Sequence, residues 1–250
     1  MFFTVLGRRM AGVALAALCS VGTAQASILI TGTRVIYPMQ EREVTVRLTN
    51  NGSQPSVVQS WLDNGDPKQT PDTADVPFVL TPPIARVDAR RSQSLRIAYT
   101  QADLPKDKES LFWLNVLEVP ATAKDMPGNT QQLRIVFRSR IKFIMRPQGL
   151  EGDSASAAEK LIWRVVPGAN GKGWAIECTN PTGFHVSFNR IELAHDGKSS
   201  DAGGGMVAPQ ATERFPLRDD LNAAPADAEI HFSTIDDYGA FVPHKSPLKP

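Results

Sequence analysis

The sequence has 250 residues, with 27 Lys and Arg against 26 Asp and Glu and a net charge of +1 at pH 7. This near balance argues against a dedicated nucleic-acid-binding protein, because such proteins usually carry a basic excess. The length is sufficient for one large domain or two smaller ones.

The first 26 residues have the features of a secretory signal peptide. A basic pair, Arg8 and Arg9, precedes a short apolar run, and residues 24–26 (AQA) form a small-x-small cleavage site. The apolar run is too short to remain as a membrane span. We therefore expect residues 1–26 to be removed by cleavage after Ala26, which leaves a nearly neutral exported chain.

After this segment, apolar and polar residues alternate with a period of two, which is typical of β-strands. Turn-forming residues such as those at 50–52 (NNG) separate the alternating runs. Many short strands, 19 prolines and no long helical pattern predict β-sandwiches. In the first half of the chain, the predicted strands cover 43–50, 55–63, 92–99 and 110–119.

One further predicted strand, 133–145, is both strongly apolar and strongly basic. Its pattern alone favours an ordinary strand that buries one apolar face in its own core. Arg134, Arg138 and Arg140 alternate with the apolar residues. We interpret these arginines as a solvated face that protects an exposed edge from self-association.

The alternating pattern stops at Pro147, and the small, polar residues that follow predict a linker over 148–156. We therefore expect two domains, 27–147 and 157–250, each near the ~100 residues of an immunoglobulin-like sandwich. Residues 195–206 are predicted to form a loop. The predicted strands of the second half cover 161–167, 173–180, 184–193, 212–217 and 228–236.

The sequence offers no recognisable catalytic, cofactor or metal site, so we do not expect an enzyme. The four histidines lack metal-ligand spacing, and no GxSxG motif is present. Cys178 has no CxxC partner and is expected to be a buried structural thiol. Asp236 and Asp237 are adjacent, and neighbouring strand residues point to opposite faces, so we do not expect them to share a proton.

Several stretches resemble the periplasmic chaperones of chaperone–usher pilus assembly. The resemblance covers nearly the whole chain after the signal peptide, and the stretches follow the order of that family. They are TRVIYP (33–38), QSWLDN (59–64), PFVLTPPIARVDA (77–89), LPKDKESLFWLNVLEVP (104–120), IKFIMRP (141–147), ECTNPTGFHVSF (177–188) and IDDYGAF (235–241).

This resemblance implies an all-β protein with two immunoglobulin-like sandwiches in a boomerang arrangement, separated by a cleft. The short loop between Pro120 and Leu133 is similar to the family branch with a short F1–G1 loop, which is associated with rod-like pili. The resemblance further implies a location in the periplasm of a Gram-negative cell.

The family's function is implied for the strand 133–145, which corresponds to the G1 strand of these chaperones. The strand would complete the unfinished sandwich of a pilus subunit, which the chaperone folds, caps and delivers to an outer-membrane usher. Ser139 stands where the family often has a fourth apolar residue. The side chains that would enter the subunit are Leu133, Ile135 and Phe137.

The resemblance also assigns five charged residues. Arg34 and Lys142 would anchor the C-terminal carboxylate of the subunit, because a carboxylate requires charge-assisted donors. Glu109, Arg146 and Asp237 would form a structural network between the domains.

The main alternative is a two-domain extracytoplasmic adhesin or structural fibre protein. That alternative predicts that Arg34 and Lys142 lie far apart, that the strand 133–145 is paired internally and that no cleft exists. In the chaperone interpretation, an exposed apolar strand also permits self-association of the free protein.

Overall fold

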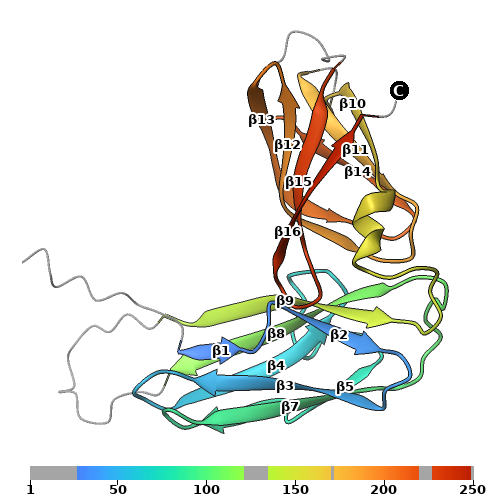
Figure 1. Cartoon of the computed structure of the whole chain (residues 1–250). Helices are drawn as coiled ribbons and strands as arrows, with labels where there is room; N and C mark the ends of the chain where they lie inside the picture. Colours follow the sequence, from blue (N-terminus) through green and yellow to red (C-terminus); the bar gives the residue numbers. More distant parts are fainter. Residues whose placement is uncertain (1–26, 121–134, 170–171, 220–226, 249–250) are drawn as a thin grey trace, which may run out of the picture.

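The computed structural model describes residues 27–120, 135–169, 172–219 and 227–248. The predicted signal peptide and Leu133 lie outside these ranges. The described residues form two β-sandwiches, as the sequence predicted, and Figure 1 shows them joined in an L-shaped arrangement. None of the described helices is long and apolar enough to cross a membrane.

The first sandwich consists of two sheets that enclose one hydrophobic core. One sheet has the order β1-β3-β7-β5, and the other has the order β2-β9-β8-β4-β6. Leu48, Leu95 and Phe143 are completely buried between them. The strands are β1 (Ile28–Ile30), β2 (Arg34–Pro38), β3 (Glu43–Asn50), β4 (Ser56–Asp63), β5 (Phe78–Thr81), β6 (Ile84–Val87), β7 (Ser92–Tyr99), β8 (Ser110–Pro120) and β9 (Phe137–Arg146).

The chain changes sheets between its first two strands. β1 pairs with β3 in one sheet, whereas β2 runs parallel to β9 in the other. Gly32 lies at this change with a φ of +91°, a conformation that a residue with a side chain rarely adopts. The change of sheet places Arg34, the first residue of β2, directly beside Lys142 of β9.

The second sandwich contains the sheets β10-β11-β14 and β13-β12-β15-β16. Trp163 and Cys178 are completely buried in its core, which confirms the expectation of a buried thiol at Cys178. Its elements are the 3₁₀-helix η1 (Ser156–Lys160) and the strands β10 (Ile162–Pro167), β11 (Trp174–Asn180), β12 (Val186–His195), β13 (Lys198–Val207), β14 (Ala211–Pro216), β15 (Glu229–Ile235) and β16 (Phe241–Pro247).

The prediction of a loop over 195–206 was wrong, because most of this segment is strand β13, paired antiparallel with β12. Its inward-facing residues are small, so the alternation is weak in the sequence: Ser200 and Ala202 are both buried. Gly205 also has a packing role, since a Cβ atom there would lie 2.8 Å from the ring of Phe215. The glycines therefore allow close packing in a strand.

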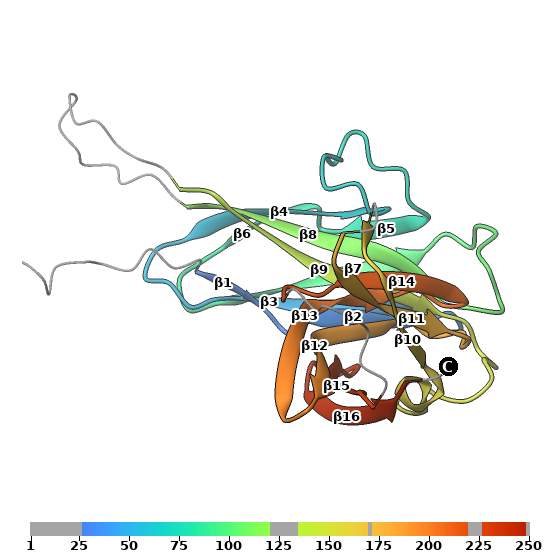
Figure 2. The same ribbon diagram turned by 90° about the horizontal axis from the view of Figure 1, so that it is seen from above.

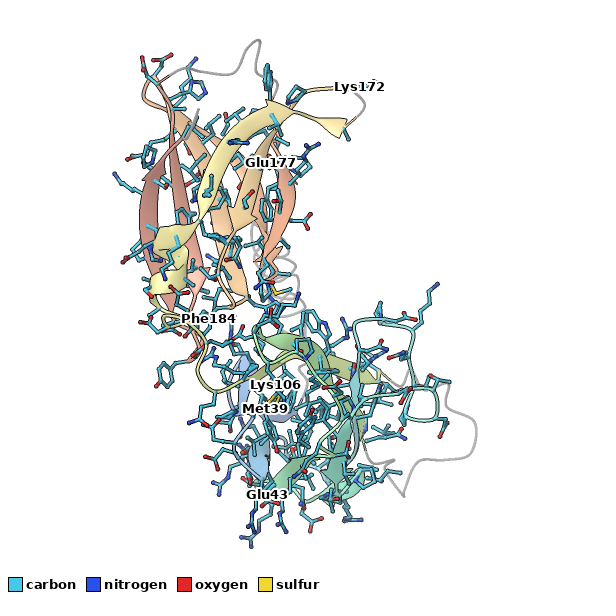
Figure 3. The ribbon with its side chains drawn as sticks, turned by 90° about the vertical axis from the view of Figure 1, so that its right-hand side faces the viewer. Met39, Glu43, Lys106, Lys172, Glu177 and Phe184 are labelled. Atoms are coloured by element: carbon cyan, nitrogen blue, oxygen red, sulfur yellow. The ribbon has the colours of Figure 1, made fainter. Side chains whose placement is uncertain are left out.

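The two sandwiches meet at one end of each domain. Figure 3 shows Phe184 at the end of the second domain nearest the first, while Lys172 and Glu177 lie toward the opposite end. The hairpin between β15 and β16 reaches the first domain at Gly239. A Cβ atom on Gly239 would lie 2.5 Å from the Thr33 hydroxyl, so the contact requires glycine.

Candidate functional site: the cleft between the domains

Arg34 and Lys142 are neighbours on adjacent parallel strands, being register partners in the β2–β9 pair. Each side chain reaches the second domain. Nη1 of Arg34 donates to the backbone oxygen of Ile235 at 2.9 Å, and Nζ of Lys142 donates to the hydroxyl of Ser187 at 2.7 Å. The two cations therefore lie side by side where the domains meet.

A cleft of about 190 Å³ lies at this junction, lined by Arg34, Arg146, Ser187 and Tyr238 among others. Within the described ranges, neither Arg34 nor Lys142 lies within ion-pair distance of a carboxylate. The Nε atom of Arg34 is buried and has no hydrogen-bond partner. Arg34, which lines the cleft, and its register neighbour Lys142 thus have unused capacity to bind an anion.

The environment of Arg34 and Lys142 disfavours their positive charges. Burial and, to a smaller extent, the positive charge of Arg34 together lower the pKa of Lys142 to about 8. Burial also lowers the pKa of Arg34, although the carboxylates of Asp237 and Asp236 partly oppose this shift. A bound carboxylate would relieve the repulsion between the two cations.

Next to the cleft, Glu109, Arg146 and Asp237 form one charge network, so the structure brings together the three residues that the resemblance grouped. Arg146 Nε donates to Glu109 at 2.6 Å, and its two terminal nitrogens donate to Asp237 at 2.7 and 2.8 Å. Glu109 is 4% exposed. The network joins the two domains, because Glu109 precedes β8 and Asp237 follows β15.

Mutual stabilisation of opposite charges dominates this network. Burial alone would lower the pKa of Arg146, but hydrogen bonds and charges from Asp237 and Glu109 raise it above its ordinary value. Burial would raise the pKa of Asp237, but the hydrogen bonds from Arg146 outweigh that effect and lower it. Arg146 and Asp237 therefore stabilise each other's charged forms.

The interdomain contacts also include residues that the sequence did not reveal. His185 donates its backbone N–H to Glu109 at 2.7 Å, and Ser154 donates its hydroxyl to Asp237 at 2.9 Å. Ser187, the partner of Lys142, lies two residues beyond His185. His185 and Ser187 fall within the family-like stretch 177–188, which was the available signal.

Strand β9 changes character along its length. Ile141, Phe143 and Met145 face the core of the first sandwich, and Phe137 continues this row as a half-buried side chain. Ile135, just before the strand, is 42% exposed. The apolar row thus leaves its own core toward its N-terminal end, whereas the pattern alone favoured burial along the whole strand.

One edge of β9 is open over the same half. β8 pairs with β9 from Phe137 to Met145, but β2 covers the opposite edge only from Lys142 to Arg146. Within the described part of the chain, no strand pairs with the β2 side of residues 137–141. Unpaired backbone groups at a sheet edge are a template for another strand.

The interpretation of the arginines as a solvated face was wrong for Arg140, whereas Arg138 is an exposed residue and Arg134 lies outside the described residues. Both described side chains lie against tryptophan rings, Arg138 over Trp61 and Arg140 over Trp113. Arg140 also forms a two-pronged ion pair with the fully buried Asp63, at 2.6 and 2.9 Å. These arginines fix β9 to its own sheet. Alternation could not predict this, because the acidic and aromatic partners come from β4 and β8.

The adhesin alternative required separated cations, no cleft and internal pairing of the strand 133–145. The register pairing of Arg34 with Lys142, together with the cleft that Arg34 lines, contradicts the first two requirements. The third is met only in part, because β9 is paired along its β8 edge but only from Lys142 onward along its β2 edge.

Comparison with known proteins gives a consistent result. Residues 27–151 match the family model described as "Pili and flagellar-assembly chaperone, PapD N-terminal domain". Residues 156–246 match the model described as "Pili assembly chaperone PapD, C-terminal domain". The chain is 42% identical over 219 residues to the probable fimbrial chaperone YadV of Escherichia coli K12, covering 87% of this chain and 88% of that protein.

The chain is also 40% identical to the chaperone protein MrkB of Klebsiella pneumoniae over 225 residues, covering 89% of this chain and 92% of that protein. Among solved structures, the YadV chaperone superposes with a TM-score of 0.76 at 39% identity, covering 89% of this chain and all of that chain. The CupB2 chaperone of Pseudomonas aeruginosa superposes with a TM-score of 0.74 at 39% identity, covering 88% of this chain and all of that chain. The chain therefore belongs to the family of pilus-assembly chaperones of the chaperone–usher pathway.

Proposed function

We propose that this protein is a periplasmic chaperone that binds, folds and caps pilus subunits by donating strand β9, and then passes them to an outer-membrane usher. In this proposal, residues 27–147 bind the subunit, residues 148–156 are the linker and residues 157–250 form the second domain. The protein acts without enzymatic activity or a cofactor.

The observation that carries the proposal is the coincidence of an open strand edge with a pair of neighbouring cations, Arg34 and Lys142. Among the described residues, the edge of β9 that faces away from β8 is unpaired up to Ile141, and the two cations lie at the next step along the strand. An extended segment that paired with this edge would gain main-chain hydrogen bonds, while its side chains pack against the exposed apolar row. A carboxylate at the end of that segment would reach Arg34 and Lys142.

The donor residues in this proposal are Leu133, Ile135 and Phe137. Burying each side chain in a partner would contribute about 1.5–3 kcal/mol before ordering costs. The anchor would also fix the register, because a slip of one residue would turn the apolar row away from the partner. Support for a subunit partner comes from the SafB chaperone, which was solved in complex with the SafA pilin and superposes with a TM-score of 0.70 at 27% identity.

The same open edge also supports self-association of the free protein. Ile135 and Val136 are 42% and 48% exposed beside it, and exposed apolar edges pair readily with a second copy. Sedimentation of the purified free protein should therefore reveal a dimer that disappears when a subunit occupies β9. A strict monomer at high concentration would contradict this part of the proposal.

The decisive experiment is co-purification from the periplasm with a subunit encoded beside the chaperone. Arg34→Ala and Lys142→Ala should each abolish the one-to-one complex while the proteins remain folded by circular dichroism. Arg86→Ala is the matched control, because Arg86 is an exposed cation that pairs with Asp88 on the surface. This variant should retain the subunit.

A second arm changes the partner instead of the chaperone. A subunit extended by a few residues at its C-terminus places the carboxylate beyond the two cations and should no longer be retained. If the anchor variants or the extended subunit bind as well as the originals, the anchor assignment fails. Phe137→Asp separately tests strand donation, since it places a charge in the apolar row.

A further inference from the structure

Glu118, on β8, is a buried carboxylate without a basic side chain beside it. It is 3% exposed, and among the residues that the structure describes no Lys, Arg or His lies within ion-pair distance of it. Buried carboxylates are rarely left without a cation, because removing a charge from water is costly. Within the described residues, Glu118 therefore has no cationic partner.

The groups that do contact Glu118 converge from the beginning of the described chain. The backbone nitrogen of Ser27 donates to both carboxylate oxygens, at 3.0 and 3.3 Å, and the backbone nitrogen of Ile28 donates at 3.1 Å. The hydroxyl of Ser56 donates at 3.0 Å, and the hydroxyl of Ser27 also donates. Both carboxylate oxygens are thus directed at the nitrogen of Ser27.

Ser27 is held in place by independent contacts. Its carbonyl oxygen accepts a hydrogen bond from the backbone nitrogen of Asn51 at 2.8 Å. A Cβ atom on Gly52 would lie 2.7 Å from the Cβ of Ser27, so the glycine leaves the space that Ser27 occupies. The nitrogen of Ser27 is therefore positioned on Glu118 by the surrounding fold.

We propose that Glu118 is the binding site for a new amino terminus at Ser27, which forms when a signal-peptidase-type enzyme hydrolyses the Ala26–Ser27 bond. The hydroxyl of the attacking water joins the carbonyl carbon of Ala26, and its remaining hydrogen goes to the nitrogen of Ser27. The resulting amine takes up one more proton at neutral pH. The backbone nitrogen of Ser27 thereby changes from an amide to an ammonium group and stays beside Glu118.

Cleavage would compensate the buried charge without moving the chain. An ammonium group at this position would add a charge–charge attraction to the hydrogen bonds that the amide nitrogen already makes. Ser27 leads into β1 of one sheet, whereas Glu118 belongs to the other sheet, so the ion pair would hold the two sheets together. Glu118 is also the register partner of Phe137, the first residue of β9.

The pair thus lies at the end of the domain where β8 and β9 run outward, and Figure 2 shows β1 at that same end. Removal of residues 1–26 would stabilise the β8–β9 pair at Glu118 and Phe137, where the apolar row begins to leave its own core. This inference concerns maturation of the fold, and it holds or fails independently of whether β9 is donated to a subunit.

The test compares two forms of the chain with the same folded residues. One form begins at Ser27, and the other keeps residues 24–26 so that the nitrogen of Ser27 remains an amide. The processed form should have a folding equilibrium constant about tenfold larger, which corresponds to about 1.4 kcal/mol, because the ammonium group adds a charge–charge attraction to a contact that the amide already makes. Urea unfolding of both forms at pH 7 measures this ratio.

Glu118→Gln supplies the specific control, since the amide keeps the shape and removes the charge. In that background, the two N-terminal forms should have equal stability. Glu177→Gln is the matched variant: it removes a carboxylate that pairs with Arg214 in the other domain and should leave the tenfold ratio intact. An equal effect of the extension in the wild type and in Glu118→Gln would overturn the proposal.

Two measurements need no substitution in case Glu118→Gln does not fold. Mass spectrometry of the protein recovered from the periplasm should give Ser27 as the first residue, and any other start would overturn the proposal. The advantage of the processed wild type should also fade well above the ordinary pKa of an α-amino group, about 7.7–8.0. Glu118 is the titratable side chain that faces this nitrogen among the described residues. Equal stability of the two forms from pH 6 to pH 10 would also overturn it.

Discussion

Raising the pH should release a bound subunit terminus from Lys142. Burial and the neighbouring Arg34 lower the pKa of Lys142 to about 8 in the free protein. A carboxylate bound to Lys142 favours the charged form, so the bound state retains a proton that the free state loses above pH 8. Affinity must therefore fall as the pH rises.

The size of the effect follows from that pKa. At pH 7 about nine-tenths of Lys142 is charged, whereas at pH 9 about nine-tenths is neutral. If the complex holds the proton throughout this range, the apparent affinity falls about tenfold, equivalent to about 1.4 kcal/mol. Arg34 remains charged between pH 7 and pH 9 and therefore adds nothing to the pH dependence of the affinity.

A synthetic peptide with the C-terminal sequence of the subunit allows this to be measured by fluorescence anisotropy between pH 7 and pH 9. Lys142→Arg should flatten the profile, because a guanidinium does not deprotonate in this range. The same peptide with an amidated C-terminus should bind weakly at every pH. A tenfold fall that persists in Lys142→Arg, or a flat profile in the wild type, would refute the reasoning.

Three further predictions concern the free protein. Arg146→Met should lower the free energy of unfolding by about 3–5 kcal/mol, because Glu109 would remain buried without its guanidinium. Urea denaturation measures this, Glu109→Gln in the same chain should restore part of the loss, and a loss near zero would contradict a buried network. Lys142→Met should stabilise the free protein at pH 7 by up to about 2 kcal/mol after allowance for solvent screening. The pKa of Lys142 is lower in the folded than in the unfolded state, so wild-type stability should rise between pH 8 and pH 10, and calorimetry should detect both effects. Burial raises the pKa of Cys178 to about 12, so a thiol reagent at pH 8 should modify the unfolded protein and leave the folded protein unmodified; rapid labelling of the folded form would contradict this.

The sequence predicted the regular strands well where burial follows a strict alternation. The segment 43–50 was predicted as a strand and is β3, because Val46 and Leu48 alternate with polar residues and enter the core. The prediction failed at β13, where Ser200, Ala202 and three consecutive glycines carry no apolar signal. Small residues fit closely packed strands, but hydrophobic periodicity cannot distinguish them from a loop.

The cleft could be predicted in part. Arg34 and Lys142 are separated by more than a hundred residues, and only the resemblance to a family brought them together in advance. Their contacts with Ser187 and Ile235 arise from docking of two domains, which no local pattern records. The same reason explains the error over Arg140, whose partner Asp63 comes from a strand far away in the sequence.

The shortness of β2 has a consequence for how a partner strand is accommodated. β2 occupies the edge of β9 from Lys142 onward and runs parallel to it. A subunit strand on the remaining edge would share that edge with β2, so the two strands would lie end to end along β9. Arg34, the first residue of β2, would then mark the end of the unpaired edge of β9 and would also contact the carboxylate of the subunit strand. If β2 began two residues earlier, fewer residues of β9 would be free to pair with a subunit strand. The position where β2 begins therefore sets how many residues of the subunit strand can pair with β9.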